Sequence, residues 1–153
     1  MGRIAAVCIS KEKGVQKKEV GRCRLIENYG LEGDAHAGSW HRQISLLPKE
    51  SRLNMEKAGD LKLNDGDFGE NLLTEGIDLS KLKVGHKLRL GRDILIRVTQ
   101  IGKECHDRCY IYYQVGDCIM PKEGVFAEIL KGGTVKTGDN IEFLDDKSSH
   151  NNN

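Results

Sequence analysis

The segment Lys83–Leu90, KVGHKLRL, and the segment Lys136–Phe143, KTGDNIEF, share one pattern. Each has a lysine, one further residue and a glycine turn, and then side chains that alternate between apolar and polar. Period-two alternation after a glycine turn is typical of a half-buried strand. Because the pattern occurs twice, we expect the two segments to form equivalent corners of a β-barrel. Between them, Asp93–Gln100, DILIRVTQ, alternates in the same way and predicts a further strand.

Other stretches predict strands nearer the N-terminus. Residues 3–9, RIAAVCI, are β-branched and apolar, and VGRCRLIENYG is expected to form a second strand. Ile44–Leu47 is a short apolar strand after a glycine-rich loop. Cys8 and Cys23 lie in the first two of these strands. A free cysteine usually packs as a small buried hydrophobe, so we interpret both as structural.

Two stretches predict short helices. Pro48–Ala58, PKESRLNMEKA, has a proline in its first turn and Gly59 as a C-terminal cap, which favours a surface helix. Pro121–Lys131 is expected to form a second helix, because its apolar residues have helical spacing and two glycines follow it. Together with the strands, these helices indicate a mainly β fold with a few short helices.

Length and composition indicate a single domain. A chain of 153 residues can bury roughly two-thirds of the surface that it exposes when unfolded. We expect one domain over residues 1–145 and a disordered polar tail over residues 146–153. The net charge of +1 gives no field that would attract nucleic acid. No run approaches the roughly 20 apolar residues that span a bilayer, so neither nucleic acid nor a membrane is an expected partner.

The cysteines indicate a reducing compartment. The N-terminus, MGRIAAVCISKEKG, lacks the apolar core and the cleavage pattern of a signal peptide, which favours the cytoplasm. Five cysteines are an odd number, so they cannot all pair within the chain. Thiols stay reduced in the cytosol. The cysteines are therefore candidates for chemistry or metal binding.

Three cysteines lie close together in Ile101–Gly133, IGKECHDRCYIYYQVGDCIMPKEGVFAEILKGG. Cys105, Cys109 and Cys118 have the cations Lys103 and Arg108 and the imidazole of His106 nearby. Cationic neighbours lower the pKa of a thiol and favour the thiolate, which is the nucleophile and the metal ligand. This stretch is therefore the expected chemical centre of the chain.

The spacing of these cysteines leaves three interpretations open. A structural zinc site could use Cys105, Cys109 and Cys118 with His106 or His36, although a second close cysteine pair is missing. A Cys105–Cys109 disulfide is the second, and it is disfavoured in the cytosol. The third is a thiolate in a cationic pocket that carries persulfide sulfur or ligates a soft or high-valent metal.

A glycine-rich loop precedes the strand at Ile44–Leu47. The sequence GLEGDAHAGSWHRQISLL places Asp34, His36, His41 and Arg42 ahead of that strand, which is typical of a site mouth. Arg42 is the expected anion ligand, because its planar fork suits phosphate or carboxylate. A solvated loop with local hydrogen bonds is the alternative. Further along, Glu70-Asn71 could offer a carboxylate and an amide to a ligand, but an exposed turn is the preferred interpretation.

Five pieces of the chain, in order, resemble the MOSC family, the domain named for the C-terminus of molybdenum cofactor sulfurase. They are GLEGDAHAG, RQISLL, FGENLLTEGIDLSKLKVGHKLRLG, VTQIGKEC and GVFAEILKGGTVKTGDNIEF. The resemblance runs over roughly residues 21–143 and is to the short stand-alone bacterial members. It implies a β-barrel-like fold with a few short helices, and a role in handling the molybdenum cofactor or its sulfur.

The resemblance also implies site residues. The family's cysteine follows the VT strand, so here it is Cys109, behind Arg108, or Cys105, where Glu104 replaces the proline of a Pro-Cys dipeptide. Cys109, Cys105 and Cys118 are the candidate metal ligands. The positions that match the other motifs would line the pocket for the pterin and its phosphate, and they are Asp34, His36, Arg42, Gln43 and Asn71.

We therefore expect a cytoplasmic domain that binds the molybdenum cofactor (molybdopterin) or carries sulfur on a reactive cysteine. Its partners would be molybdenum cofactor biosynthesis proteins or a molybdoenzyme. A chain of 153 residues has no room for the aminotransferase-like domain of large family members, so it would receive sulfur rather than generate it. The alternatives are a small zinc-stabilised binding module without sulfur chemistry, and a molybdenum-dependent catalyst that takes electrons from a partner.

Overall fold

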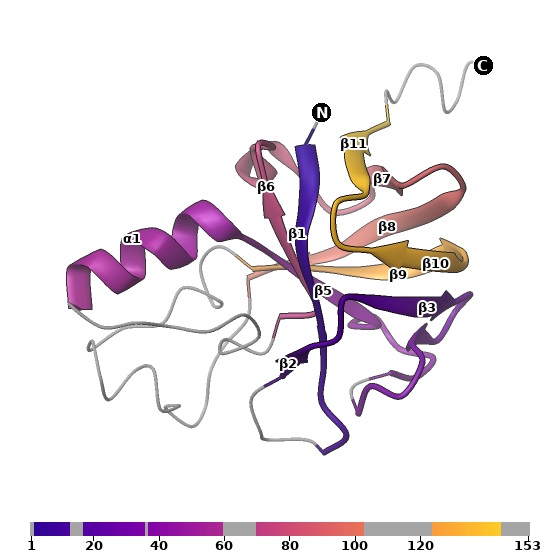
Figure 1. Cartoon of the computed structure of the whole chain (residues 1–153). Coiled ribbons are helices and arrows are strands. Elements are labelled where there is room, and N and C mark those ends of the chain that lie inside the picture. Colours follow the sequence, from indigo (N-terminus) through magenta and orange to yellow (C-terminus); the bar gives the residue numbers. More distant parts are fainter. Residues whose placement is uncertain (1, 13–16, 36, 60–69, 103–123, 145–153) are drawn as a thin grey trace.

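The computed structural model describes residues 2–12, 17–35, 37–59, 70–102 and 124–144. Within these residues, seven strands close into a barrel in the order β11-β7-β8-β9-β5-β6-β1, and β1 pairs back to β11 (Figure 1). The barrel strands are β1 (Gly2–Ile9), β5 (Ile44–Pro48), β6 (Leu72–Glu75), β7 (Lys87–Leu90), β8 (Ile94–Ile101), β9 (Val125–Lys131) and β11 (Asn140–Phe143).

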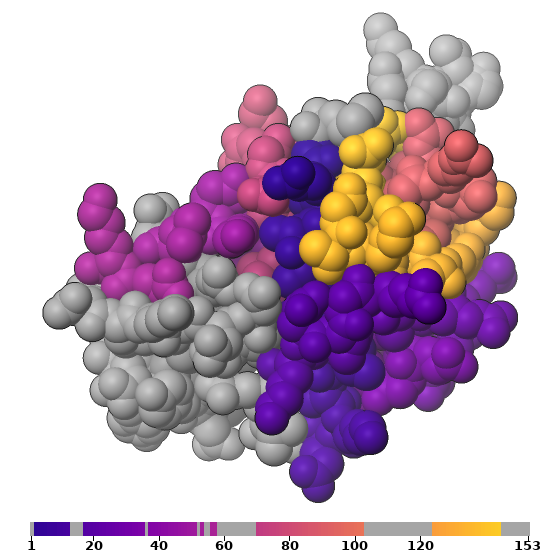
Figure 2. Space-filling model, viewed as in Figure 1, coloured from indigo at the N-terminus to yellow at the C-terminus, as the bar shows by residue number. Residues whose placement is uncertain are grey.

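The other strands form a small sheet against the barrel. Its order is β10-β3-β4. Strand β2 is not part of this sheet and pairs antiparallel with the C-terminal end of β1. In the space-filling view, the yellow atoms of the C-terminal strands lie directly on the purple atoms of β3 (Figure 2), as the β10–β3 pairing requires. The bounds are β2 (Lys18–Glu19), β3 (Arg22–Ile26), β4 (Gly30–Leu31) and β10 (Gly133–Lys136).

The two segments with the shared pattern pair with each other. They contain β7 and β11, which run antiparallel with Leu90 opposite Ile141 and Leu88 opposite Phe143. Leu88, Leu90 and Ile141 are fully buried, as their alternation predicts. The predicted strand between them is β8, and its alternating isoleucines and valine line the core. The prediction of a mainly β, barrel-like fold is confirmed.

One helix is described, together with a 3-10 turn at η1 (Leu79–Lys81). The helix α1 (Lys49–Gly59) confirms the prediction for Pro48–Ala58, with Pro48 as the last residue of β5. Because β5 and β6 run parallel, the chain must cross over between them, and α1 lies in that connection. Among the described residues, no helix is long and apolar enough to cross a membrane.

The helix prediction for Pro121–Lys131 is wrong where the structure describes it. Residues 125–131 form β9, which pairs with β5 on one side and β8 on the other. Val125, Phe126 and Ala127 are all buried. A strand that is covered on both faces has a nearly continuous apolar run, and such a run can match helical spacing by chance.

The barrel interior contains one buried hydroxyl without a described partner. Thr74 on β6 is fully buried, and its Oγ1 has no hydrogen-bond partner among the described residues. Thr74→Val is therefore expected to raise the free energy of unfolding by about 1–2 kcal/mol, because valine has the same shape without the desolvated hydroxyl. Urea unfolding measures the change. Thr99→Val is the matched control, since Thr99 Oγ1 donates to the His41 carbonyl and its loss should not stabilise the fold.

Candidate functional site

Five residues at one level of the barrel define the candidate site. Ser45 on β5 pairs with Phe126 on β9, and Phe126 pairs in turn with Gln100 on β8. On the other side of β5, Asn71 lies beside Ser45, and Cys8 lies beside Asn71, through the backbone hydrogen bonds Asn71 N to Ser45 O and Cys8 N to Asn71 O. We call this set the site row: Cys8, Asn71, Ser45, Phe126 and Gln100.

The side chains of the row face away from the barrel interior. Successive residues of a strand point to opposite faces of a sheet. The neighbours of the row along their strands belong to the buried core cluster, namely Val7, Ile44, Leu46, Leu72, Val125 and Ala127. Ser45, Asn71 and Phe126 therefore face outward, where Asp34 and Arg42 of the glycine-rich loop meet them.

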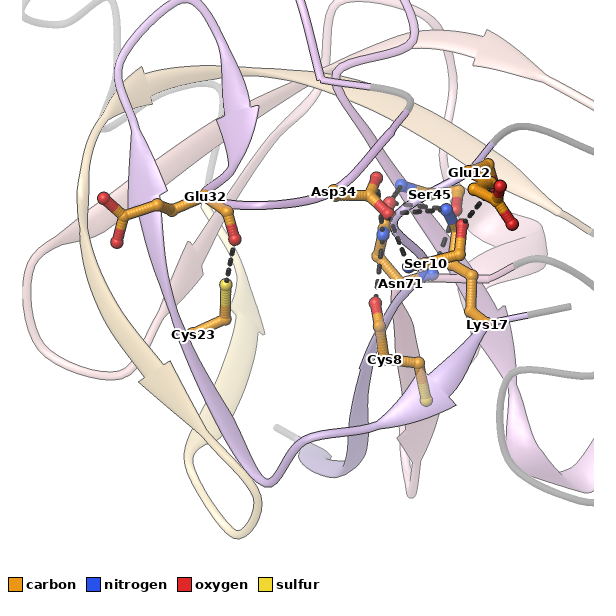
Figure 3. Close-up of polar contacts among 9 residues, drawn as sticks. All are labelled: Cys8, Ser10, Glu12, Lys17, Cys23, Glu32, Asp34, Ser45 and Asn71. Atoms are coloured by element: carbon orange, nitrogen blue, oxygen red, sulfur yellow. Dashed lines mark hydrogen bonds and ion pairs between the residues drawn. The ribbon is translucent and has the colours of Figure 1, made fainter. Parts of the chain in front are cut away.

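Asp34 is the centre of a buried hydrogen-bond network on one half of the row (Figure 3). Its Oδ1 accepts from the Ser10 backbone N–H at 3.1 Å and from Lys17 Nζ at 2.7 Å. Its Oδ2 accepts from Asn71 Nδ2 at 3.2 Å. The side chains of Lys17 and Asp34 are 1% and 0% exposed, so the ion pair is removed from water. Removing one partner of a buried ion pair is strongly destabilising, so this pair keeps the loop in its position.

Asn71 ties this network to the strands. Its Oδ1 accepts from the backbone N–H of Ser45 at 3.0 Å and lies 3.2 Å from Ser45 Oγ, while its Nδ2 also donates to the Cys8 carbonyl at 3.1 Å. The preferred interpretation of Glu70-Asn71 as an exposed turn is wrong, because both residues are buried. The reason is that Asn71 already takes part in the sheet, one residue ahead of β6.

Arg42 lies on the other half of the row. Its guanidinium is 5.1 Å from the Phe126 ring centroid and 6.0 Å from that of Trp40. Its Nε donates to Gln100 Oε1 at 3.0 Å. Aromatic faces attract a guanidinium, so the contacts with both rings and with Gln100 fix its position. Within the described chain, its two terminal nitrogens have no hydrogen-bond partner.

Gln100 joins Arg42 to the start of the cysteine-bearing stretch. Its Nε2 donates to the Gly102 carbonyl at 2.6 Å, and the Gly102 N–H donates to the Gly124 carbonyl at 2.7 Å. The chain therefore leaves the barrel and returns to it beside Arg42. Cys105, Cys109, Cys118 and the neighbouring cations lie outside the described residues, as do His36 and the predicted tail 146–153. The described residues contain no group of three or more metal-ligating side chains.

The side-chain amide of Gln43 forms two hydrogen bonds within the protein, one through its nitrogen and one through its oxygen. The residue is 1% exposed, its Nε2 donates to Asn28 Oδ1 at 3.0 Å, and its Oε1 accepts from the Ile129 N–H at 2.9 Å. The loop also needs Gly30, which has a φ of +139° and whose added Cβ would lie 2.6 Å from the Gln43 carbonyl oxygen. These contacts hold the glycine-rich loop against the barrel, and a cofactor-binding role of Gln43 stays a prediction.

Sequence reasoning missed Lys17 and four members of the site row, namely Cys8, Ser45, Phe126 and Gln100. Cys8 is interpreted from sequence as structural, and Phe126 falls in the run that predicts a helix. Lys17 lies in a lysine-rich stretch that reads as a solvated loop, and nothing in its pattern marks it as buried. Ser45 carries no signal beyond its place in an apolar strand. Gln100 could have been found, because it ends a predicted strand immediately before the cysteine stretch.

Cys8 and Cys23 are in the predicted strands, β1 and β3. Cys8 is fully buried, and Cys23 is partly buried, with Sγ 3.4 Å from the Glu32 carbonyl. Burial and the Glu32 carboxylate raise the pKa of the Cys23 thiol. A raised pKa means less thiolate at a given pH.

Iodoacetamide should therefore alkylate Cys23 slowly near neutral pH and faster as the pH rises, and Glu32→Gln should accelerate the reaction severalfold. Mass spectrometry measures both rates, and equal rates in the two proteins would contradict the electrostatic effect.

A depression of about 520 Å³ lies beside the row. Its lining includes Pro48, Ile77, Ile101 and Val125, and none of the described candidate site residues. Ile101 follows Gln100 and Val125 precedes Phe126 in their strands, so the depression opens on the opposite side of β8 and β9 from Arg42. It is therefore separate from the site row.

Comparisons with known proteins agree with this architecture. A family model described as MOSC domain matches residues 33–142. The YUAD protein from Bacillus subtilis has a similar structure, with a TM-score of 0.76 and 18% identity over 92% of this chain and 93% of that one. YiiM from Geobacillus stearothermophilus gives 0.72 and 19%, over 95% and 76% of the two chains. YiiM from Escherichia coli gives 0.68 and 24%, over 95% and 70%.

No curated protein matches the chain. At these identities the structural likeness establishes the fold alone. The family match is a separate finding, because it rests on the sequence and covers most of the chain.

Proposed function

The chain belongs to the MOSC domain family, and from that premise we propose that it binds the molybdenum cofactor and presents a reactive cysteine to it. The cysteine, Cys109 or Cys105, would ligate molybdenum or carry sulfur to a molybdoenzyme. When bound, the cofactor would supply the molybdenum and the dithiolene sulfurs. Partners would be that enzyme or cofactor biosynthesis proteins in the cytoplasm.

One observation carries the proposal. Arg42 is held on Phe126 and Gln100 with terminal N–H donors that no described residue satisfies, beside the two ends of the cysteine-bearing stretch. A phosphate fits these donors, because a guanidinium binds its oxygens in a fork. The residues present therefore fit the phosphate end of the cofactor.

The other candidates would serve in different ways. His36 is a candidate for hydrogen bonds to the pterin. Asp34 and Asn71 would act mainly by holding the loop in place, since most of their hydrogen-bonding groups are occupied within the protein. For the thiolate, the sequence places Lys103, His106 and Arg108 near Cys105 and Cys109, and cations favour ionised sulfur.

The test is cofactor retention by single serine variants. Cys109→Ser and Cys105→Ser proteins, purified without oxygen, are analysed for molybdenum and for pterin fluorescence, with Cys23→Ser as the matched control. We expect one of the first two to lose the metal and Cys23→Ser to keep it. Equal loading of all proteins and wild type would remove the thiolate role. Stoichiometric zinc, together with unfolding by a chelator, would instead support the zinc-stabilised module.

A further inference from the structure

The register of β8 shifts by one residue just before Gln100. Val98 pairs with Ala127 on β9, whereas Gln100 pairs with Phe126, so two steps along β8 correspond to one step along β9. In a regular strand, Gln100 would point to the same face as Val98, which belongs to the barrel core. The extra residue, Thr99, instead turns Gln100 outward, to the face of Phe126. Bulges of this kind often redirect a side chain beside a functional site.

The amide of the redirected Gln100 can take only one orientation. Its Nε2 lies 2.6 Å from the Gly102 carbonyl oxygen, which only accepts hydrogen bonds. Its Oε1 lies 3.0 Å from Arg42 Nε, which only donates. Rotating the amide by half a turn would place two acceptors together on one side and two donors together on the other. Gln100 therefore holds Arg42 Nε through its oxygen and the backbone after β8 through its nitrogen.

The bond to Gln100 leaves one edge of the Arg42 guanidinium for a ligand. A guanidinium can bind two oxygens of an anion through either of two edges, Nε with one terminal nitrogen or the two terminal nitrogens together. At the first edge, an anion would have to displace the amide oxygen that already accepts from Nε. At the second edge, no described residue accepts a hydrogen bond. The two terminal nitrogens are therefore the pair that is available.

The contact with Phe126 does not select between these edges. The ring centroid lies 5.1 Å from Arg42 Cζ, with the guanidinium over the ring. Such a contact keeps a cation near the ring face, whichever edge the cation turns toward a ligand. A hydrogen bond to Nε is directional and acts on one edge only. The choice of edge therefore depends on Gln100.

We propose that Gln100 is the positioning residue of Arg42, which occupies Nε and directs an oxyanion such as a phosphate monoester to the two terminal nitrogens. The same amide ties this edge to Gly102, whose N–H donates to the Gly124 carbonyl where the chain returns to the barrel. The anion is thereby held at a set place beside the ends of the cysteine-bearing stretch. This role rests on the proposed function, because the anion would be the phosphate end of the cofactor.

The first measurement needs no ligand. Nitrogen-15 NMR follows the exchange of the Arg42 Nε–H with water in wild type, Gln100→Met and Thr99→Val. Methionine has a similar length to glutamine but cannot accept from Nε. Exchange should be about tenfold faster in Gln100→Met, because a protecting hydrogen bond is lost. Thr99→Val is the matched control, since it removes a hydrogen bond from the same bulge to the backbone of His41, and exchange should stay as in wild type.

The second measurement titrates the full chain with methyl phosphate, a simple monoester. In wild type the signals of the terminal nitrogens of Arg42 should shift, while the Nε–H signal stays in place because its bond to Gln100 persists. Gln100→Met should bind methyl phosphate about three- to tenfold more weakly, because the edge is no longer held toward the anion. Thr99→Val should bind it like wild type. The wild-type titration tests the choice of edge without any substitution.

Arg42→Lys shows whether Gln100 acts through the guanidinium. A lysine ammonium is a point charge whose donors rotate freely, so it has no edge to select. Adding Gln100→Met to Arg42→Lys should therefore change the methyl phosphate affinity by less than about twofold. An equal loss in the arginine and lysine backgrounds would show that Gln100 only supports the fold of the loop. Urea unfolding checks that each variant is folded under the conditions of the titration.

Three results would overturn the positioning role. These are a shift of the Nε–H signal as large as that of the terminal nitrogens, wild-type affinity in Gln100→Met, and equal losses in the two backgrounds. The outcome is separable from the proposed function. If Arg42→Lys weakens binding and Gln100→Met does not, the phosphate contact of Arg42 stands and the role of Gln100 fails. If wild type binds no methyl phosphate, the proposed phosphate contact fails, and the role of Gln100 fails with it.

Discussion

Replacing Asp34 with alanine is expected to lower the free energy of unfolding by about 3–5 kcal/mol, because it removes the carboxylate that pairs with the buried Lys17 ammonium at 2.7 Å. The same change removes the acceptor of the Ser10 N–H and of Asn71 Nδ2. The network holds the glycine-rich loop to the barrel, so cofactor retention should fall as well. Urea unfolding near neutral pH, followed by the fluorescence of the single tryptophan, Trp40, measures the stability.

Two controls show whether the buried charge is responsible. The double variant Lys17→Met with Asp34→Asn removes both charges and should be at least about 1 kcal/mol more stable than Asp34→Ala. Glu75→Ala breaks an ion pair of the exposed Arg3, and such surface pairs contribute little. A loss in Asp34→Ala no larger than in Glu75→Ala would show that the Lys17–Asp34 pair does not hold the loop.

Asn71→Asp should also be strongly destabilising, by about 3 kcal/mol or more, although it hardly changes the shape of the side chain. Asn71 Nδ2 donates to Asp34 Oδ2 at 3.2 Å and to the Cys8 carbonyl at 3.1 Å. In the variant, an oxygen at that position would face two acceptors, and one of them is a carboxylate. The same unfolding measurement detects the loss.

The swapped pair tests the direction of this hydrogen bond. Adding Asp34→Asn to Asn71→Asp returns a donor to the contact and should recover part of the lost stability. Asn140→Asp on β11 is the matched control, because its side chain is exposed and surface substitutions usually stay within about 0.5 kcal/mol. If Asn71→Asp behaved like Asn140→Asp, the amide would not be needed as a donor.

The elements that the sequence predicts well have one buried face. The strands β7, β8 and β11 alternate, since the barrel interior takes every second side chain, and this pattern is visible without a structure. The sequence of β9 predicts a helix instead, because burial on both faces erases the alternation. The barrel core covers its inner face, Arg42 of the glycine-rich loop lies on Phe126 of its outer face, and local sequence does not contain these partners.

The site was predictable only in part, for a similar reason. Asp34 and Arg42 stand out because they lie in a glycine-rich loop ahead of an apolar strand. Their partners do not, since Lys17 and Gln100 are distant in sequence and meet them only through the barrel register. The cofactor roles of Asp34, His36, Arg42, Gln43 and Asn71, and of the cysteines, stay predictions that the experiments above address.

The pairing of β1 with β11 has a consequence for synthesis on the ribosome. This pairing joins Gly2 and Arg3 to Asn140 and Ile141, and it closes the barrel. A nascent chain that has not yet reached Asn140 would leave one edge of β1 and one edge of β7 unsatisfied. Open strand edges attract other chains. The polypeptide is therefore expected to self-associate most readily before β11 has been synthesised, and less readily once β11 can pair with β1.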